Sequence, residues 1–164
     1  QRQMCIRDSS VRENMILALQ AKRGMFKLMS RKEQEELTDK YIKMLQVKTA
    51  SRETPIKSLS GGNQQKAIIA REVEQDSPLM IFVQPTRGLD IGAIENIHKQ
   101  IIAERDKGKA ILLISLELDE IMNCADTIAV IYNGSIQKIA KASELTTNEV
   151  GEFMMGVKNK EKEA

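Results

Sequence analysis

The sequence predicts an α/β domain with a helical N-terminal part, parallel core strands and a C-terminal β-hairpin. Three observations support this fold class. Capping pairs and apolar residues at helical spacing fill the first part of the chain, two continuous apolar runs flank one long helix, and an Asn-Gly pair joins two β-rich segments. With 164 residues the chain is long enough for one domain with a hydrophobic core.

The composition excludes several classes of function. A net charge of +2 and 3% aromatic residues provide neither the basic field of duplex binding nor a stacking surface, so we expect no nucleic-acid partner. Cys5 and Cys124 match no metal-ligand spacing and His98 is the only histidine, so we expect no metal site. No apolar run reaches the roughly 18 residues of a membrane-spanning helix, which predicts a cytosolic or membrane-peripheral chain.

We expect residues 9–75 to form the helical part. Residues 1–8 show neither helix nor strand periodicity and are interpreted as a non-native leader. Two Ser-x-x-Glu pairs have capping-box spacing before a helical pattern: Ser10 and Glu13 before a helix over 11–19, and Ser30 and Glu33 before a helix ending near Val47. A polar loop with Pro55 then leads to a third helix that ends near Gln75.

We expect residues 76–157 to form the core, followed by a flexible tail over 158–164. The order strand, helix, strand is typical of a parallel pair, and Asn133-Gly134 is a strong hairpin signal. The expected elements are strands 79–83 and 110–114 around a helix from about 92 to 108, a helical turn 118–122, hairpin strands 127–132 and 135–140, and a last helix to about 155 capped by Thr146 and Glu149.

The central motif is Leu-Ser-Gly-Gly-Asn-Gln-Gln-Lys at 59–66, a loop that runs directly into a helix. Ser60 is placed to cap that helix, and Gly61 and Gly62 let backbone N–H groups approach a ligand closely. A helix N-terminus carries about half a positive charge and unpaired N–H donors, so the pattern indicates a phosphate site. A glycine-rich cap without a ligand is the alternative that Ser-Gly-Gly alone leaves open.

The whole octapeptide resembles the signature motif of ATP-binding cassette (ABC) ATPases, in the form seen in importers of sugars and related ligands. The resemblance covers about residues 9–157, with the elements in the family's order: signature, strand, Pro85–Asp90 as D-loop, strand, switch region and hairpin. It implies a partial P-loop NTPase domain whose Walker A half is missing and lies upstream. The pair Gly108-Lys109 ends a helix and leads into a strand, so it is interpreted as a helix C-cap.

Three positions depart from the family pattern at the places where hydrolysis needs chemical groups. Val83 and Gln84 stand where the family's Walker B has Asp and Glu, and Leu116 stands where the switch loop has His. Val83 offers no ligand to magnesium, Gln84 does not accept a proton at neutral pH, and Leu116 does not bind a γ-phosphate. The resemblance therefore implies no catalytic residue and no metal ligand in this chain, which we expect to be inactive alone.

In the family, ATP lies between the Walker A motif of one cassette and the signature of another. Carried over to this sequence, Ser60, Gly61 and Gly62 would donate to the γ-phosphate of ATP held in trans, Gln64 would order that loop, and Asp90 would lie at the dimer interface. ATP and Mg²⁺ would be shared with a first nucleotide-binding cassette. The other implied partners are transmembrane permease subunits at the cytoplasmic face of the plasma membrane and, indirectly, an extracytoplasmic substrate-binding protein.

The transported substrate is left open, since the stretch after Gln84 looks like the degenerate second cassette of nucleoside importers and 10–66 more like that of pentose and hexose importers. Three alternatives remain open beside an importer subunit. A chromosome-condensation or mismatch-repair ATPase would require coiled-coil heptads and basic surfaces, which the sequence lacks. A non-catalytic interaction module would bind its partner without ATP, and a truncated or composite translation product would have no function.

Overall fold

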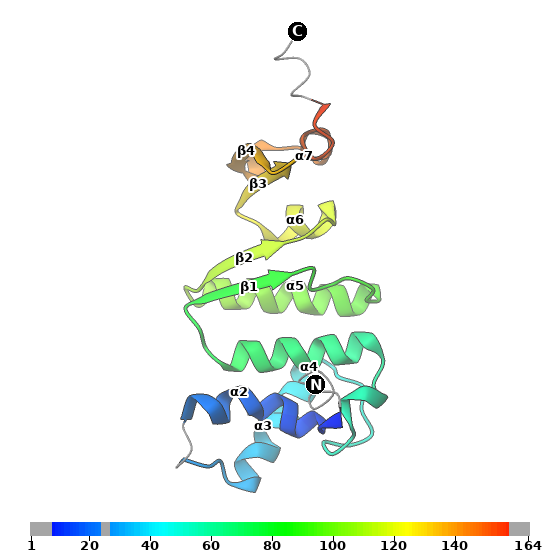
Figure 1. The fold of residues 1–164 in the computed structure, drawn as a ribbon, viewed down its shortest axis with the longest axis vertical. Helices are drawn as coiled ribbons and strands as arrows, with labels where there is room; N and C mark the ends of the chain where they lie inside the picture. Colours follow the sequence, from blue (N-terminus) through cyan, green and yellow to red (C-terminus); the bar gives the residue numbers. More distant parts are fainter. Residues whose placement is uncertain (1–7, 24–26, 158–164) are drawn as a thin grey trace. The chain divides into compact units, whose positions relative to one another are not determined.

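The computed structural model describes residues 8–23 and 27–157, which belong to two compact units (Figure 1). The first unit is Gln1–Met80 with Pro85–Ala110, and the second is Ile81–Gln84 with Ile111–Ala164. The expected leader, apart from Asp8, and the expected tail lie outside the described residues. The division expected near residue 76, between a helical part and a core, stays a prediction.

Helices make up the first unit. Its elements are α2 (Val11–Arg23), α3 (Arg31–Met44), the 3-10 turn η1 (Ile56–Ser58), α4 (Gly61–Glu74) and α5 (Ile91–Asp106). Helix α2 packs against both α3 and α4, and its Val11 and Met15 are buried at that contact. Helix α2 runs beyond the expected end at residue 19, because Lys22 and Arg23 favour the negative end of the helix dipole and Lys22 Nζ donates to the Gln75 carbonyl at 2.6 Å.

Strands β1 (Leu79–Val83) and β2 (Ala110–Ile114) form a two-stranded sheet at the expected residues. The Ala110 N–H donates to Pro78 O at 2.9 Å, and the Gln84 N–H donates to Ile114 O at 2.8 Å. Because the partners advance together along both segments, the pair is parallel, as the strand, helix, strand order predicts.

The second unit contains an antiparallel hairpin with helices packed against it. Its elements after β2 are α6 (Leu118–Cys124), β3 (Thr127–Tyr132), β4 (Ser135–Lys141), the 3-10 turn η2 (Ala142–Glu144) and α7 (Thr147–Met154). The turn residues Asn133 and Gly134 have φ of 49° and 77°, the two positive values that a tight hairpin turn requires. Helix α7 packs on β3 and α6, and its Val150 is buried with Ile128 and Val130 of β3.

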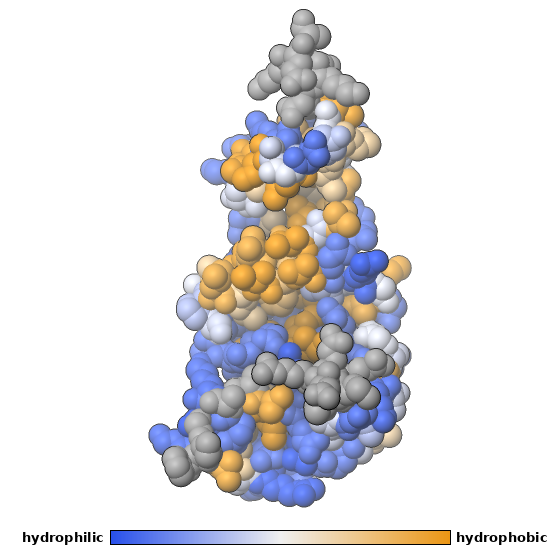
Figure 2. Space-filling view, viewed as in Figure 1, coloured by the Kyte–Doolittle hydropathy of each residue, from blue (hydrophilic) through white to orange (hydrophobic). Residues whose placement is uncertain are grey.

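One face of the parallel pair is apolar and exposed. Along β1, Met80 and Phe82 are buried, whereas the alternate side chains Leu79, Ile81 and Val83 are exposed. Leu112 and Ile114 of β2 are also about half exposed. These residues lie in the broad hydrophobic patch over β1 and β2 in Figure 2. Since strands of parallel sheets are normally covered on both faces, this patch is an unusual surface.

Candidate functional site

The candidate site is the N-terminus of α4, where Ser60 caps the helix. Ser60 has extended backbone angles, φ −60° and ψ 154°, and its Oγ accepts a hydrogen bond from Asn63 N at 3.4 Å. The Gln64 N–H donates to Ser60 O at 2.9 Å. Within the part of the chain that the structure describes, the N–H groups of Gly61 and Gly62 have no partner. They are the first-turn donors that a helix N-terminus presents to an anion.

The two glycines of this turn have different surroundings. A Cβ built on Gly61 would meet no atom within 4 Å, so a side chain there would have open space. A Cβ on Gly62 would lie 3.0 Å from Leu89 Cδ2, so the absence of a side chain at Gly62 admits Leu89. The structure thereby brings the 59–62 loop together with the turn before α5, two segments that are separated in sequence.

Asp90, expected at a dimer interface, caps α5. Its Oδ1 accepts from Ala93 N at 2.8 Å, and the turn before it is closed by a hydrogen bond from Leu89 N to Thr86 O at 3.1 Å. Thr86 is buried, and Gly88 has the positive φ of 74° that this turn requires. Asp90 therefore has a structural role in this chain, and its role toward a second cassette stays a prediction.

Gln64 lies where it orders the loop. Its Nε2 donates to Leu59 O at 2.8 Å, which fixes the residue that precedes the cap. Asn63, which sequence analysis did not single out, is equally well held. Its Nδ2 donates to Ser60 Oγ at 2.9 Å and its Oδ1 accepts from Lys48 N at 2.8 Å. The sequence offered one signal for this role, since Asn63 is the third residue after a capping serine.

Lys66 supports this arrangement from the next turn of α4. Its side chain is mostly buried, and Nζ donates to Gln46 O at 3.2 Å. Gln46 has a φ of 51°, in the left-handed region that non-glycine residues seldom adopt. The Lys66 bond and the Asn63 bond to Lys48 thus hold the segment after α3 against the start of α4.

The three departures from the family pattern lie in the second unit, at the ends of the parallel strands. Val83 ends β1, and Gln84 follows it with a φ of 50° and its N–H bonded to Ile114 O at 2.8 Å. Leu116 is 69% exposed, so an apolar side chain stands in solvent at the switch position. Among the described residues no three His, Cys, Asp or Glu side chains are placed to hold a metal ion.

A charged cluster in the first unit is centred on Glu104 of α5, its buried member. Glu104 is fully buried and accepts from Lys107 and Lys109, each at 2.6 Å, and from Gln100 Nε2 at 2.8 Å. Lys109 also pairs with Asp76 at 2.7 Å. Burial acts to raise the pKa of Glu104, but the hydrogen bonds from the two lysines outweigh it and hold that pKa below its ordinary value. The cluster has paired charges, which is typical of a structural role.

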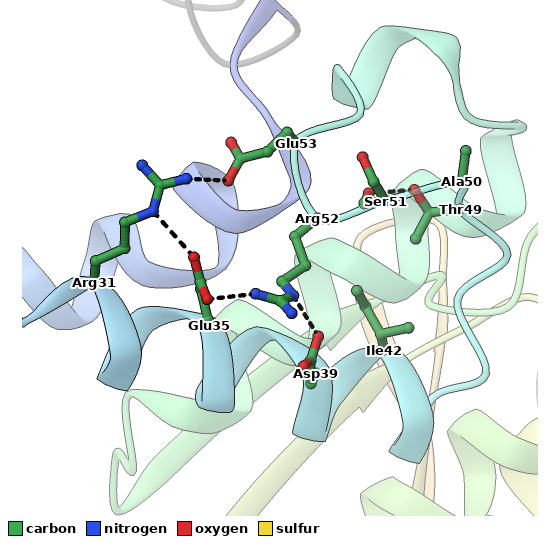
Figure 3. Close-up of a pocket in the computed structure, with 9 residues that line it drawn as sticks. All are labelled: Arg31, Glu35, Asp39, Ile42, Thr49, Ala50, Ser51, Arg52 and Glu53. Carbon is green, nitrogen blue, oxygen red and sulfur yellow. Dashed lines mark hydrogen bonds and ion pairs between the residues drawn. The ribbon is translucent and has the colours of Figure 1, made fainter.

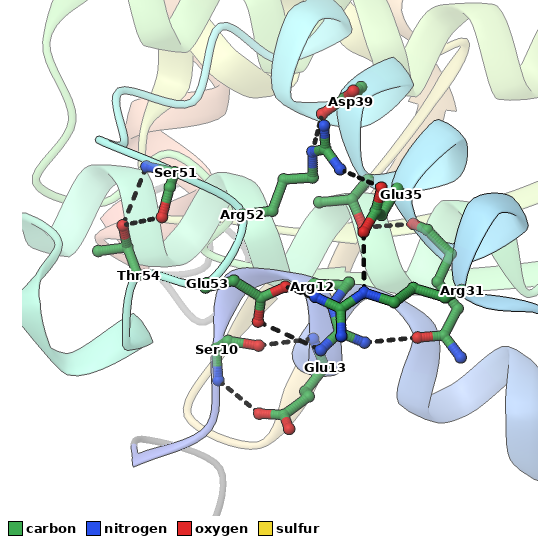
Figure 4. Close-up of polar contacts among 12 residues, drawn as sticks. Ser10, Arg12, Glu13, Arg31, Glu35, Asp39, Ser51, Arg52, Glu53 and Thr54 are labelled. Carbon is green, nitrogen blue, oxygen red and sulfur yellow. Dashed lines mark hydrogen bonds and ion pairs between the residues drawn. The ribbon is translucent and has the colours of Figure 1, made fainter.

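A groove of ≈ 510 Å³ lies beside α3 (Figure 3). Arg52 reaches from the loop to Glu35 at 2.7 Å and to Asp39 at 2.8 Å, and Arg31 pairs with Glu35 at 3.0 Å. Figure 4 shows that the ion pairs continue through Glu53, which pairs with Arg12 at 2.8 Å. The acidic and basic side chains of the groove pair with one another. We therefore interpret the groove as a structural contact in which ion pairs hold the loop at residues 49–53 against α3.

No protein-family model matches the chain, whereas curated proteins do. It is 61% identical over 99 residues to the nucleoside import ATP-binding protein NupA of Lactococcus lactis, a match that covers 60% of this chain and 20% of that protein. It is 53% identical over 115 residues to the guanosine import ATP-binding protein NupO of Bacillus subtilis, covering 70% and 22%. Identity to the ribose import ATP-binding protein RbsA of Clostridium perfringens is 36% over 156 residues, covering 94% and 31%. The chain thus spans less than a third of each.

Solved structures with low identity share the fold. A dimeric ATP-binding cassette in a post-hydrolysis state, bound to ADP and Pi, matches with a TM-score of 0.70 at 22% identity, over 82% of this chain and 57% of that chain. A metal-chelate type ABC transporter in an inward-facing conformation matches with a TM-score of 0.74 at 15% identity, over 91% and 59%. The cassette fold expected from the order of the motifs is confirmed. Within the described residues, every helix is too short or too polar to cross a bilayer.

Proposed function

Because this chain is a homologue of the ATP-binding proteins of bacterial sugar and nucleoside importers and has the fold of an ATP-binding cassette, we propose that it provides half of an ATP site. In this proposal Ser60, Gly61 and Gly62 bind the terminal phosphate of an ATP molecule that a second cassette holds. The chain contributes the signature turn at 60–62, and the second cassette contributes the Walker A loop that holds the ATP phosphates.

The geometry at the start of α4 carries this proposal. The N–H groups of Gly61 and Gly62 and the Ser60 hydroxyl lie in one exposed turn, at the positive end of a 14-residue helix. A side chain at Gly61 would meet no neighbouring atom, whereas one at Gly62 would meet Leu89. The exposed donors of this turn support the proposal, because a phosphate accepts hydrogen bonds from such groups at a helix N-terminus.

The same chain lacks the groups that would hydrolyse ATP or hold its metal. Bound ATP requires Mg²⁺ to neutralise its phosphates and a carboxylate to accept a proton from the attacking water. Val83, Gln84 and Leu116 supply neither a metal ligand nor a base. In this proposal the Mg²⁺ ligands and the base come from the second cassette, which also holds the ATP.

In the whole transporter, ATP binding at this half-site would be coupled to transport of the ligand. We infer an importer of simple sugars or nucleosides, in which this chain works with a first cassette and with permease subunits at the cytoplasmic face of the membrane. An extracytoplasmic substrate-binding protein would select the ligand. The names of the relatives support this class of transporter.

The test is ATP-dependent association with a phosphate-loop cassette. The purified chain, carrying a fluorophore, is titrated with the separately expressed first cassette of the Bacillus subtilis guanosine importer protein, with and without Mg·ATP. We expect association only with Mg·ATP, and we expect Ser60→Arg to abolish it because a bulky cation then fills the phosphate position. Ser30→Arg, at the cap of α3, is the matched control and should associate normally.

Three outcomes would contradict the proposal. Association that is equally strong without ATP would favour an interaction module. Micromolar binding of Mg·ATP by the chain alone would show that the chain has a complete ATP-binding site of its own. Absence of any association would remove the trans role.

A further inference from the structure

We propose that Asn63 is a positioning residue that turns the Ser60 hydroxyl outward as a hydrogen-bond donor. The inference rests on the proposed function, because it concerns how the same half-site presents itself to a phosphate. It adds a residue to that site and assigns it a specific action, the control of one proton's direction.

The hydrogen bonds at Ser60 Oγ carry the first step. A serine hydroxyl has two acceptor lone pairs and one donor hydrogen. Both acceptor positions are taken by the same residue, since Asn63 N donates at 3.4 Å and Asn63 Nδ2 at 2.9 Å. The hydroxyl hydrogen is left pointing away from Asn63, and the side chain is exposed. Ser60 is thus set to donate to a group in front of the helix.

The orientation of the Asn63 amide follows from its other neighbour. The Lys48 backbone N–H is a donor only, and it lies 2.8 Å from the Asn63 side chain. Only the amide oxygen can accept that bond, so the amide nitrogen must face Ser60. The bond from Lys66 Nζ to Gln46 O keeps the segment containing Lys48 against α4. The Lys48 N–H, in the segment after α3, therefore sets the orientation of the Asn63 amide, and the amide in turn sets the direction of the Ser60 hydroxyl hydrogen.

The cap of α7 shows the opposite polarity. At α7 the third residue after the cap is Glu149, and the Thr146 hydroxyl donates to its Oε2 at 2.9 Å. A carboxylate only accepts, so it draws the hydroxyl hydrogen inward. Glutamate also follows the caps Ser10 and Ser30 at this spacing. At α4 the neutral Asn63 gives a hydrogen to the cap, and it places no negative charge beside an incoming phosphate.

A double-mutant cycle in the ATP-dependent association assay tests this action. Ser60→Ala and Asn63→Ala are each expected to weaken association with the first cassette by about tenfold, the effect of one charge-assisted hydrogen bond. The double variant is expected to be no weaker than Ser60→Ala, since Asn63 acts through Ser60. Additive losses, or no loss in Asn63→Ala, would overturn the inference. Gln65→Ala, a neighbouring amide outside the hydrogen-bond chain, is the matched control.

A second variant separates positioning from folding. Asn63→Glu creates the capping box found at α2 and α7, so we expect its thermal midpoint to equal or exceed that of the parent chain while association is lost. Full association by Asn63→Glu would overturn the inference. The two proposals fail differently: if the parent chain does not associate, the half-site is wrong, and if Ser60→Ala weakens association while Asn63→Ala does not, only the role of Asn63 is wrong.

Discussion

Leu89 occupies the space that a side chain at Gly62 would need, with 3.0 Å between Leu89 Cδ2 and the position of a Cβ on Gly62. The contact joins the first turn of α4 to the turn before α5. In the proposed half-site, it ties the phosphate-binding loop to the segment expected at the cassette interface.

We therefore expect Gly62→Ala to destabilise the chain by about 1 kcal/mol, because overpacking forces Leu89 to move. Gly61→Ala is the matched control, since a Cβ there meets nothing and alanine favours a helix over glycine by roughly 0.8 kcal/mol. Urea unfolding of both variants measures the difference. Adding Leu89→Ala should recover part of the loss in Gly62→Ala, and an equal stability of the two single variants would contradict the contact.

Glu104 is the residue whose loss should cost most. Its carboxylate is fully buried and accepts from Lys107, Lys109 and Gln100, so Glu104→Ala breaks a buried ion pair and leaves Gln100 without this acceptor, and it is expected to destabilise by about 3 kcal/mol. Asp106→Ala, at an exposed acid of the same helix, is the control and should change stability by less than about 1 kcal/mol. Guanidinium unfolding at neutral pH compares them. A loss in Glu104→Ala no larger than that in Asp106→Ala would show that the cluster is not buried in solution.

The same cluster predicts a loss of stability in acid. The folded-state pKa of Glu104 lies below its unfolded value, so its contribution is present above about pH 4.5 and disappears as the pH falls through the folded pKa. The pKa of Lys109 is affected most by burial, which lowers it, but bonds to Asp76 and Glu104 raise it overall. Its contribution is complete below about pH 10.4 and is lost as the pH rises through the folded pKa. Unfolding curves across this range should show a smaller acid dependence in Glu104→Gln.

Tyr41 should contribute through its hydroxyl as well as its ring. It is buried, and its hydroxyl donates to Glu74, which also pairs with Lys40 at 3.6 Å. Burial, followed by the negative charge of Glu74, holds the pKa of Tyr41 well above its ordinary value. Tyr41→Phe is expected to cost about 1 kcal/mol in urea unfolding, because the half-buried Glu74 carboxylate loses a donor. Tyr132→Phe, at an exposed hairpin position, should cost almost nothing.

The apolar face of β1 and β2 predicts how the isolated chain behaves in solution. Ile81 is 59% exposed on this face, whereas the next residue, Phe82, is buried. Ile81→Lys should reduce binding of a hydrophobic dye and slow concentration-dependent aggregation without lowering the thermal midpoint. Phe82→Lys should unfold the chain, because it buries an unpaired charge. Equal dye binding by the parent chain and Ile81→Lys would show that this face is covered in solution.

The elements that form through local rules could be predicted from the sequence. The capping pairs at Ser10, Ser30 and Thr146 hydrogen-bond as expected, and the hairpin turns at Asn133-Gly134. Strand β1 begins and ends at the expected residues, because Asp76, Ser77 and Pro78 interrupt the helix and an apolar run follows. The position of the Ser60 cap also follows from sequence, since Ser-Gly-Gly before a helical pattern fixes a cap locally.

The direction in which side chains point, and the residues with which they pair, could not be predicted without the tertiary structure. Glu104 faces the interior, where Lys107 at the end of α5 and Lys109 just after it pair with the carboxylate, and a periodic pattern of apolar residues does not predict a buried acid. Arg52 pairs with α3 only once the loop folds back on that helix.

By itself, then, the sequence determined most of the helix, strand and turn segments and the position of the α4 cap, because those choices depend on neighbours a few residues away. The tertiary structure decided how the turn is presented. Leu89 against Gly62 and Lys48 against Asn63 are contacts between segments distant along the chain. Since the direction of the Ser60 proton depends on the second of these contacts, the chemistry of the turn is a property of the fold.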